Sequence, residues 1–162
     1  MNLDFAFLLS GPQAASLLSG LSTTFKLFAG AWLLALAFAI LLTTVRATPA
    51  RPAQWLVAAV VEYHRNVPLL VQIMLWYFGI PQLLPDSIRI WVNSRETEFL
   101  FAMIAIALNA GAFMSEDMRS GIRAIPATQM EAARSVGLRF LQAMRHVIMP
   151  QALRVAIPPM IN

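Results

Sequence analysis

The sequence predicts an all-α integral membrane protein. Hydrophobic residues make up 59% and charged residues 12% of the 162-residue chain, whereas soluble domains average about 45–50% apolar and about 25% charged residues. Two segments, 27–45 and 99–115, contain no charged residue over 19 and 17 positions, close to the ~20 residues that a helix needs to cross a bilayer. Most arginines lie between or after these segments, as expected for loops outside the bilayer.

The composition also argues against several functions. The chain has no cysteine, and its two histidines, His64 and His146, are far apart, so we expect no metal centre and no bound cofactor. The net charge is +4, but the arginines do not alternate with aromatic residues, and we expect no nucleic-acid partner. No phosphate-binding loop of the GxxxxGK[ST] type occurs. We therefore expect no enzyme activity and no nucleotide site in this chain.

The first element follows an N-terminal arm. Gly11-Pro12 and Gly20 interrupt residues 1–20, which predicts a short interfacial arm rather than a span. The start of the chain lacks the basic segment of a signal peptide, so we expect the first apolar region to be retained. The first span should run over 22–45 and end at Arg46.

The second span is less regular. The apolar run 69–80 would rise only about 18 Å as a helix, too little to cross ~30 Å of hydrocarbon. We therefore expect a helix from about residue 53 that is broken or kinked near Pro68 and ends near Gly79. An irregular connection that starts at Pro81 should then lead to the third span.

The third span, 99–115, is rich in alanine and also contains Gly111. Small side chains let helices approach closely, which favours association inside a bilayer. We interpret 21–162 as one membrane domain, with a polar loop over about 116–154.

Arginine placement predicts the orientation, because loops on the cytoplasmic side carry an excess of Lys and Arg. The N-terminal arm and the 81–98 connection hold few basic residues, among them Arg89 and Arg95. The other loops hold more: Arg46, Arg51, Arg119, Arg123, Arg134, Arg139, Arg145 and Arg154. The N-terminus should therefore be outside and the 116–154 loop cytoplasmic.

The polar loop contains signals for two short helices. Thr128 and Glu131 have capping-box spacing, which predicts a helix that begins at Gln129. Gly137 can adopt the left-handed conformation that ends it, and a second helix over 138–148 should stop at Pro150. Helices this short are marginal alone, so we expect them to pack on a cytoplasmic partner.

The same loop resembles a known family. Glu131-Ala132-Ala133, then Gly137, then Val147-Ile148-Met149-Pro150 resemble the EAA loop of permease subunits of ABC importers. Upstream, segments 62–72, 108–113 and 119–126 are similar to the branch that imports polar amino acids of the histidine, glutamine or glutamate type. The family pattern has Ile where Val147 stands and Leu where Met149 stands, and both replacements remain apolar.

The resemblance implies the transmembrane domain of a type I ABC importer. About three of its usual five spans are present, so the chain is expected to be truncated at its C-terminus. It implies a multi-pass permease subunit that moves a polar amino acid across the bacterial inner membrane, with a periplasmic N-terminus. The 126–150 loop would couple it to a cytoplasmic ATP-binding cassette subunit. The other implied partners are a second permease subunit, identical or related, a periplasmic amino-acid-binding protein and membrane lipid.

The resemblance assigns ATPase docking to five residues of the loop: Glu131, Ala132, Ala133, Gly137 and Pro150. The first four also have a purely structural interpretation. Glu131 could serve only as a cap, the two alanines only as helix formers, and Gly137 only as a turn residue. An alternative function stays open as well: a truncated membrane scaffold that docks an ATPase but does not transport.

A second candidate site consists of polar residues near the spans. Glu62 and Arg65 lie on one helix face and could pair with each other, or they could meet a zwitterionic substrate. Asn109 could line the same substrate path or form a hydrogen bond between helices. Ionisable groups at membrane depth are functional candidates, whereas Glu116 and Asp117 fit ion pairing with nearby arginines.

Overall fold

The computed structural model describes residues 11–48, 50–93 and 97–161. Every regular element in these ranges is a helix, which confirms the predicted all-α class. The elements are α2 (Gly11–Arg46), α3 (Arg51–Asn66), α4 (Leu69–Met74), the π-helical turn η1 (Leu75–Gly79), α5 (Ile80–Leu83), α6 (Asp86–Asn93), α7 (Thr97–Arg123), α8 (Ala127–Ser135), α9 (Phe140–Ala143), the π-helical turn η2 (Met144–Ile148) and α10 (Met149–Ile161).

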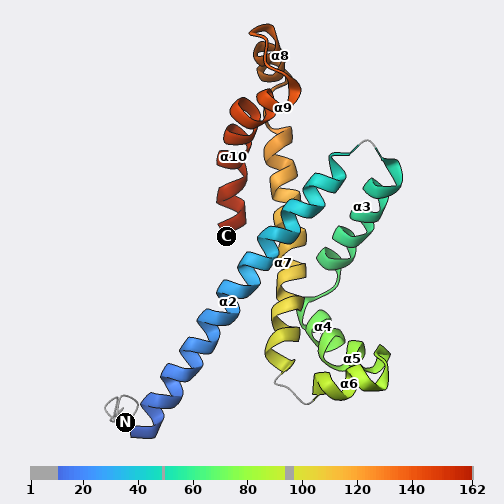
Figure 1. Ribbon diagram of the computed structural model, residues 1–162. Helices are drawn as coiled ribbons and strands as arrows, with labels where there is room; N and C mark the ends of the chain where they lie inside the picture. The colour runs from blue at the N-terminus through green and yellow to red at the C-terminus, as the bar shows by residue number, and fades with distance from the viewer. Residues whose placement is uncertain (1–10, 49, 94–96, 162) are drawn as a thin grey trace.

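The molecule is organised around α7. Helix α2 crosses it at an angle, and α3 and α10 lie on opposite sides of this pair (Figure 1). Helices α4 to α6 gather at one end of α7, and α8 and α9 extend beyond the other end (Figure 1). The N-terminal half of α2 projects away from the other helices, and the buried residues of α2 all lie in its C-terminal half.

Helices α2 and α7 are long and apolar enough to cross a membrane, which agrees with the predicted first and third spans. The predicted start of the first span near residue 22 is wrong, because α2 begins at Gly11. Pro12 lies in the first turn, where the N–H that proline lacks needs no partner inside the helix. Residues 11–20, predicted as an arm, therefore belong to the same helix as the first span, and residues 1–10, Pro49 and Arg95 lie outside the described residues.

The predicted break near Pro68 is confirmed. Helix α3 ends at Asn66, Val67 and Pro68 are extended, and α4 begins at Leu69. Proline disfavours the helical conformation of the residue before it, so the break is local in origin. The second predicted span is therefore two helical segments that meet at this break.

Pro81 and Pro150 do not end their helices, contrary to prediction. Helical structure continues past Gly79 into α5 and past Pro150 into α10. Each proline follows a π-helical turn, in which the N–H of Ile80 bonds to the carbonyl oxygen of Leu75 and that of Met149 to Met144. The wider turn lets the helix pass a residue that lacks an N–H and crowds the preceding turn.

Helix α7 contacts its neighbours through small residues, as predicted for this span. A Cβ atom on Gly111 would lie 2.7 Å from the carbonyl oxygen of Ala35 in α2. A Cβ atom on Gly121 would lie 2.5 Å from the carbonyl oxygen of Ala152 in α10. We call these two glycines and the two alanines that face them the small-residue seam. Backbones can approach this closely only where side chains are absent or very short.

Candidate functional site

Helix α8 starts differently from the capping-box prediction. Its N-cap is Pro126, no side chain caps it, and Thr128 lies in the first turn. The carbonyl oxygen of Pro126 accepts the first hydrogen bond from the N–H of Gln129 at 3.0 Å. Because Pro126 is extended and its carbonyl oxygen accepts this bond, the helix begins at Ala127, and the predicted start at Gln129 is wrong.

The turn at Gly137 is as predicted. Its φ angle is +85°, in the left-handed region that favours glycine. The N–H of Gly137 bonds to the carbonyl oxygen of Arg134 at 2.9 Å, and that of Leu138 to Ala133 at 3.2 Å. This pair of bonds is the Schellman arrangement that closes a helix. The side-chain oxygen of Gln142 then accepts the N–H of Arg139 at 2.9 Å and supports the start of α9.

Helices α8 and α9, with η2, form a hairpin that extends beyond the end of α7 (Figure 1). Ala133 is buried within it, whereas Glu131, Ala132 and Gly137 are exposed. A long-range contact joins the hairpin to α10, because the amide nitrogen of Gln151 lies 3.3 Å from the side-chain oxygen of Gln129. Helix α8 thus packs against α9 and η2, and Ala133 lies in this contact.

An exposed apolar surface lies beside the turn, and the family resemblance assigns no role to its residues. Val136, Phe140 and Leu141 have relative exposures of 76%, 54% and 78%. We call these three residues the apolar rim of the hairpin. The signal was present in the sequence, since these three apolar residues lie close to Gly137 in the chain. Pro150, the fifth predicted docking residue, is exposed but lies in α10 rather than at the turn.

A buried polar network lies at the break between α3 and α4. Gln72 is 1% exposed and His64 is 7% exposed. The side-chain oxygen of Gln72 lies 2.7 Å from Nδ1 of His64, and its amide nitrogen donates to the carbonyl oxygens of His64 and Val67 at 3.0 and 2.8 Å. The break exposes carbonyl groups that lack helical partners, and buried polar groups need partners. Gln72 supplies these partners. The sequence could have indicated this role, because Gln72 is the only side-chain amide in the apolar run 69–80.

Asn109 joins α7 to this network. Its amide nitrogen donates to the carbonyl oxygen of His64 at 2.7 Å. Of the two sequence interpretations, the structure therefore shows the hydrogen bond between helices.

Glu62 and Arg65 do not pair with each other. The guanidinium carbon of Arg65 lies 5.3 Å from the ring centroid of Phe113 in α7, a distance at which cation and ring attract. Both side chains are exposed, and Glu62 forms no ion pair with any residue that the structure describes. Arg65 therefore contacts Phe113 of α7 rather than Glu62 of its own helix.

Glu116 does form ion pairs, as the sequence indicated. Its carboxylate contacts the guanidinium of Arg46 in α2 and lies 3.7 Å from that of Arg119 in α7. The link to Arg46 joins residues 70 positions apart, so it could not be read from local spacing. Within the described ranges, no cluster of His, Asp or Glu side chains has the arrangement of a metal site.

The chain matches known proteins along most of its length. Residues 35–162 match the family of binding-protein-dependent transport system inner membrane components. The chain is 39% identical to the probable glutamine ABC transporter permease protein GlnM of Bacillus subtilis over 83% of its own length and 56% of that protein. It is 37% identical to the glutamate/aspartate import permease protein GltJ of Escherichia coli, over 88% of this chain and 59% of that one.

Other relatives extend the match over the whole chain. The arginine transport system permease protein ArtQ of Bacillus subtilis is 34% identical over 100% of this chain and 69% of its own. A crystal structure of an amino acid ABC transporter with histidines matches with a TM-score of 0.79 and 30% identity, over 99% of this chain and 70% of that one. The chain thus spans just over half to about two thirds of the length of these proteins.

The helical architecture and these matches agree. The chain has the fold of a type I ABC importer transmembrane domain, and it belongs to the family of binding-protein-dependent transport system inner membrane components.

Proposed function

We propose that the chain is a permease subunit of an ATP-driven importer of polar amino acids, and that the hairpin of α8 and α9 docks a cytoplasmic ATPase. The relatives named above carry glutamine, glutamate/aspartate and arginine in their names, which supports a polar amino acid as substrate. A second permease subunit and a periplasmic binding protein complete the proposed transporter.

The observation that carries the docking proposal is the exposed surface of the hairpin. It presents Glu131, Ala132 and Gly137 next to the apolar rim. The buried centre of a protein interface is more apolar than its polar periphery, so exposed apolar side chains next to polar ones fit a contact with a partner. Small residues such as Ala132 let a partner approach the helix closely.

The test is capture of a cytoplasmic ATPase from the same transporter by the chain in detergent. Leu141→Asp and Ala132→Arg place a charge or bulk on the proposed surface, and both should reduce capture at least tenfold. Ala50→Lys is the matched control, because Ala50 is exposed in the connection between α2 and α3. Equal capture by all four proteins would exclude the hairpin as the docking site.

Uptake separates transport from the scaffold alternative. The chain, its ATPase and the binding protein would be reconstituted into proteoliposomes with labelled glutamine, glutamate or arginine. ATP-dependent accumulation is the expected result, and docking without accumulation would identify a scaffold. Glu62 and Arg65 are exposed and remain our candidates for the substrate path, whereas the amide nitrogen of Asn109 already bonds to α3.

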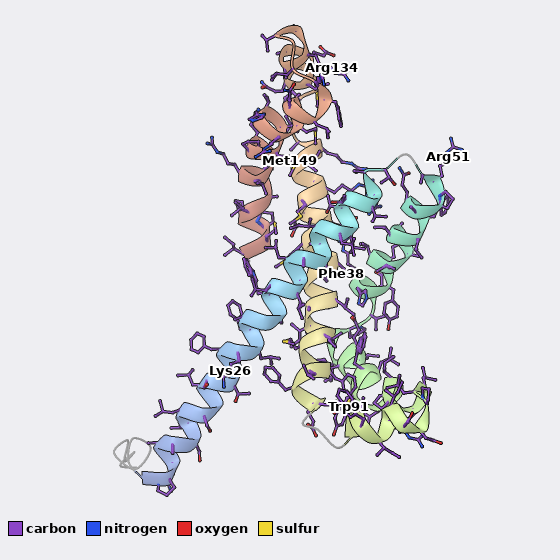
Figure 2. The ribbon with its side chains drawn as sticks, in the orientation of Figure 1. Lys26, Phe38, Arg51, Trp91, Arg134 and Met149 are labelled. Atoms are coloured by element: carbon purple, nitrogen blue, oxygen red, sulfur yellow. The ribbon has the colours of Figure 1, made fainter. Side chains whose placement is uncertain are left out.

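We also propose a cytoplasmic hairpin and a periplasmic N-terminus. Arg51 and Arg134 lie toward one end of the molecule, whereas Trp91 lies toward the other (Figure 2). Because the chain has no cysteine, single cysteines can report the orientation. Gln82→Cys should react with a membrane-impermeant maleimide in intact spheroplasts, and Ala50→Cys should react only after lysis. The reverse pattern would invert the proposed orientation.

A further inference from the structure

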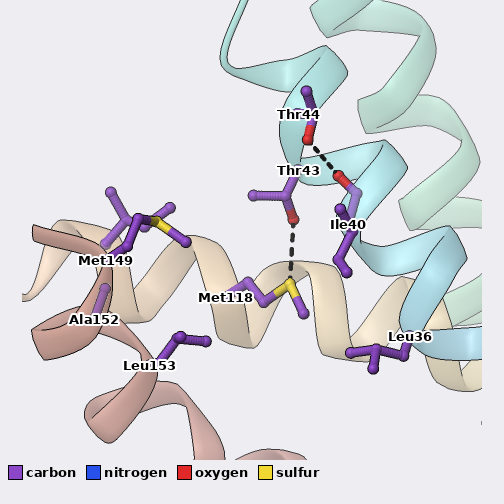
Figure 3. A pocket seen from close by; sticks show the side chains of 9 residues that line it. Leu36, Ile40, Thr43, Thr44, Met118, Met149, Ala152 and Leu153 are labelled. Carbon is purple, nitrogen blue, oxygen red and sulfur yellow. Dashed lines mark hydrogen bonds between the residues drawn. The ribbon is translucent and has the colours of Figure 1, made fainter. Parts of the chain in front are cut away.

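An apolar cavity of about 320 Å³ lies between α2, α7 and α10. Its lining includes Leu36 and Ile40 from α2, Met118 from α7 and Leu153 from α10. Two threonines, Thr43 and Thr44, also contribute to the wall (Figure 3). Their hydroxyl groups are directed to partners within the protein. Thr43 Oγ1 lies 3.4 Å from the carbonyl oxygen of Ser115 and 3.8 Å from Met118 Sδ, and Thr44 Oγ1 donates to the carbonyl oxygen of Ile40 at 2.7 Å (Figure 3). The cavity therefore presents an almost entirely apolar surface.

A smaller cavity of about 220 Å³ adjoins the first one, and three arginines contribute to its otherwise mainly apolar lining. We call it the basic cavity. Arg46, Arg119 and Arg123 line it. Thr43 and Ile122 line both cavities, so the apolar space and the basic space share a wall between α2 and α7.

The basic cavity has an excess of positive charge. Glu116 pairs with Arg46 and Arg119, while Arg123 is exposed and forms no ion pair with any described residue. The next carboxylate, Asp117, interacts with Glu116 and also with Arg65 of α3. The guanidinium of Arg119 is in turn repelled by those of Arg46 and Arg123. Three cations thus share one directly paired carboxylate, and an anion would be attracted here.

The position of the basic cavity fits the membrane surface. Arg46 and Arg119 also line a polar recess with Trp55, whose side chain is 77% exposed. Tryptophan is enriched at the level of the lipid headgroups. The apolar cavity borders α2 and α7, the two helices long enough to cross the bilayer.

We propose that these adjoining cavities bind one anionic phospholipid. Its phosphate would lie against Arg46, Arg119 and Arg123, and one acyl chain would occupy the apolar cavity. Basic pockets between transmembrane helices bind the headgroups of anionic lipids in this way, and each buried methylene adds to the affinity of the acyl chain. The positive charge of the basic cavity and the apolar surface of the adjoining cavity together favour a phospholipid over a free anion or a hydrocarbon.

The test is native mass spectrometry of the full chain released from micelles that contain equal amounts of phosphatidylglycerol and phosphatidylcholine with identical acyl chains. The wild-type chain should retain phosphatidylglycerol preferentially. Arg123→Gln should reduce that preference about fivefold, the effect of losing one arginine near an anionic membrane surface. Arg145→Gln is the matched control, because Arg145 is exposed in η2 and lines neither cavity.

Two further experiments separate the contribution of the acyl chain from that of the phosphate. Thr44→Phe should fill the apolar cavity and reduce retention of both lipids, and soluble glycerol phosphate should not displace bound phosphatidylglycerol. Equal retention of the two lipids by the wild type, or equal losses in Arg123→Gln and Arg145→Gln, would overturn the proposal. Displacement by glycerol phosphate would show an anion site without a lipid. Helix content from circular dichroism checks each variant, and the two arginine variants decide the question if Thr44→Phe does not fold.

Discussion

The small-residue seam and the hairpin are two contact surfaces of opposite construction. In the seam, Gly111 and Gly121 bring the backbone of α7 against the carbonyl oxygens of Ala35 and Ala152. In the hairpin, a Cβ atom on Gly137 would meet nothing within 4 Å, and the apolar rim is exposed. The seam depends on the absence of side chains, whereas the hairpin depends on a backbone turn. Substitutions in the seam should therefore affect folding, and substitutions in the hairpin should mainly affect what binds to it.

The largest effect is expected from Gly121→Ala. The new Cβ would lie 2.5 Å from the carbonyl oxygen of Ala152 and 3.0 Å from the Cβ of Ala156, so α7 and α10 must separate. Overpacking of this kind costs about 3 kcal/mol, measurable as a lower thermal unfolding temperature in detergent. Gly20→Ala is the matched control, since nothing lies within 4 Å of its new Cβ, and replacing glycine in a helix should stabilise the chain by about 0.5–1 kcal/mol. Similar shifts in both variants would show that the seam is not tightly packed.

Gln72→Leu extends the comparison to buried polar contacts. The change leaves Nδ1 of His64 and the carbonyl oxygen of Val67 without the partners that they have in the wild type. Loss of these bonds should destabilise the chain by about 2 kcal/mol, measured by the same unfolding experiment. Gln82→Leu removes an exposed amide and should change the unfolding temperature little. If both variants behaved alike, the network would contribute nothing to the stability of the break.

Gly137→Ala should have a smaller and more local effect. Alanine in the left-handed conformation costs roughly 1–2 kcal/mol, so the turn at φ +85° should open more often. Hydrogen exchange at the amides of residues 136–139 should accelerate, while exchange in α7 should not change. Gly137→Asn should have less effect, because asparagine tolerates this conformation better. Equal protection of the turn in wild type and alanine variant would contradict the requirement for glycine.

The smallest effect is expected from Thr128→Ala. Thr128 is exposed and caps no backbone N–H, so the free energy of unfolding should change by less than about 0.5 kcal/mol. Gln142→Ala is the contrasting variant, because Gln142 accepts the N–H of Arg139 at the start of α9 and its loss should cost about 1 kcal/mol. Exchange of the amides in α8 and α9 measures both effects. A larger effect at Thr128 would restore the capping-box interpretation.

The predictions that hold depend on conformations that single residues permit, whereas the prediction that fails at the start of α8 depended on a choice between two local signals. The break near Pro68 and the turn at Gly137 depend on the conformations that proline and glycine permit, so adjacent residues were sufficient to predict them. The start of α8 was also a local question, but two local signals competed there. Pro126 prevailed over the capping spacing of Thr128 because its carbonyl oxygen already accepts the N–H of Gln129.

The sequence by itself determined the helical class, the two long apolar spans, the family and the hairpin turn. Composition, motifs, apolar run length and local backbone preference can be read without knowing which distant residues meet. Only the tertiary structure decided the partners of distant residues. It joins Asn109 to His64 and Glu116 to Arg46 across separations of 45 and 70 positions, and it places Gly121 against Ala152. It also allows the helix to continue through Pro150, because the π-helical turn before that residue accommodates its ring. The three contacts of Asn109, Glu116 and Gly121 arise from the packing of α7 against its neighbours, and local backbone preferences do not specify them.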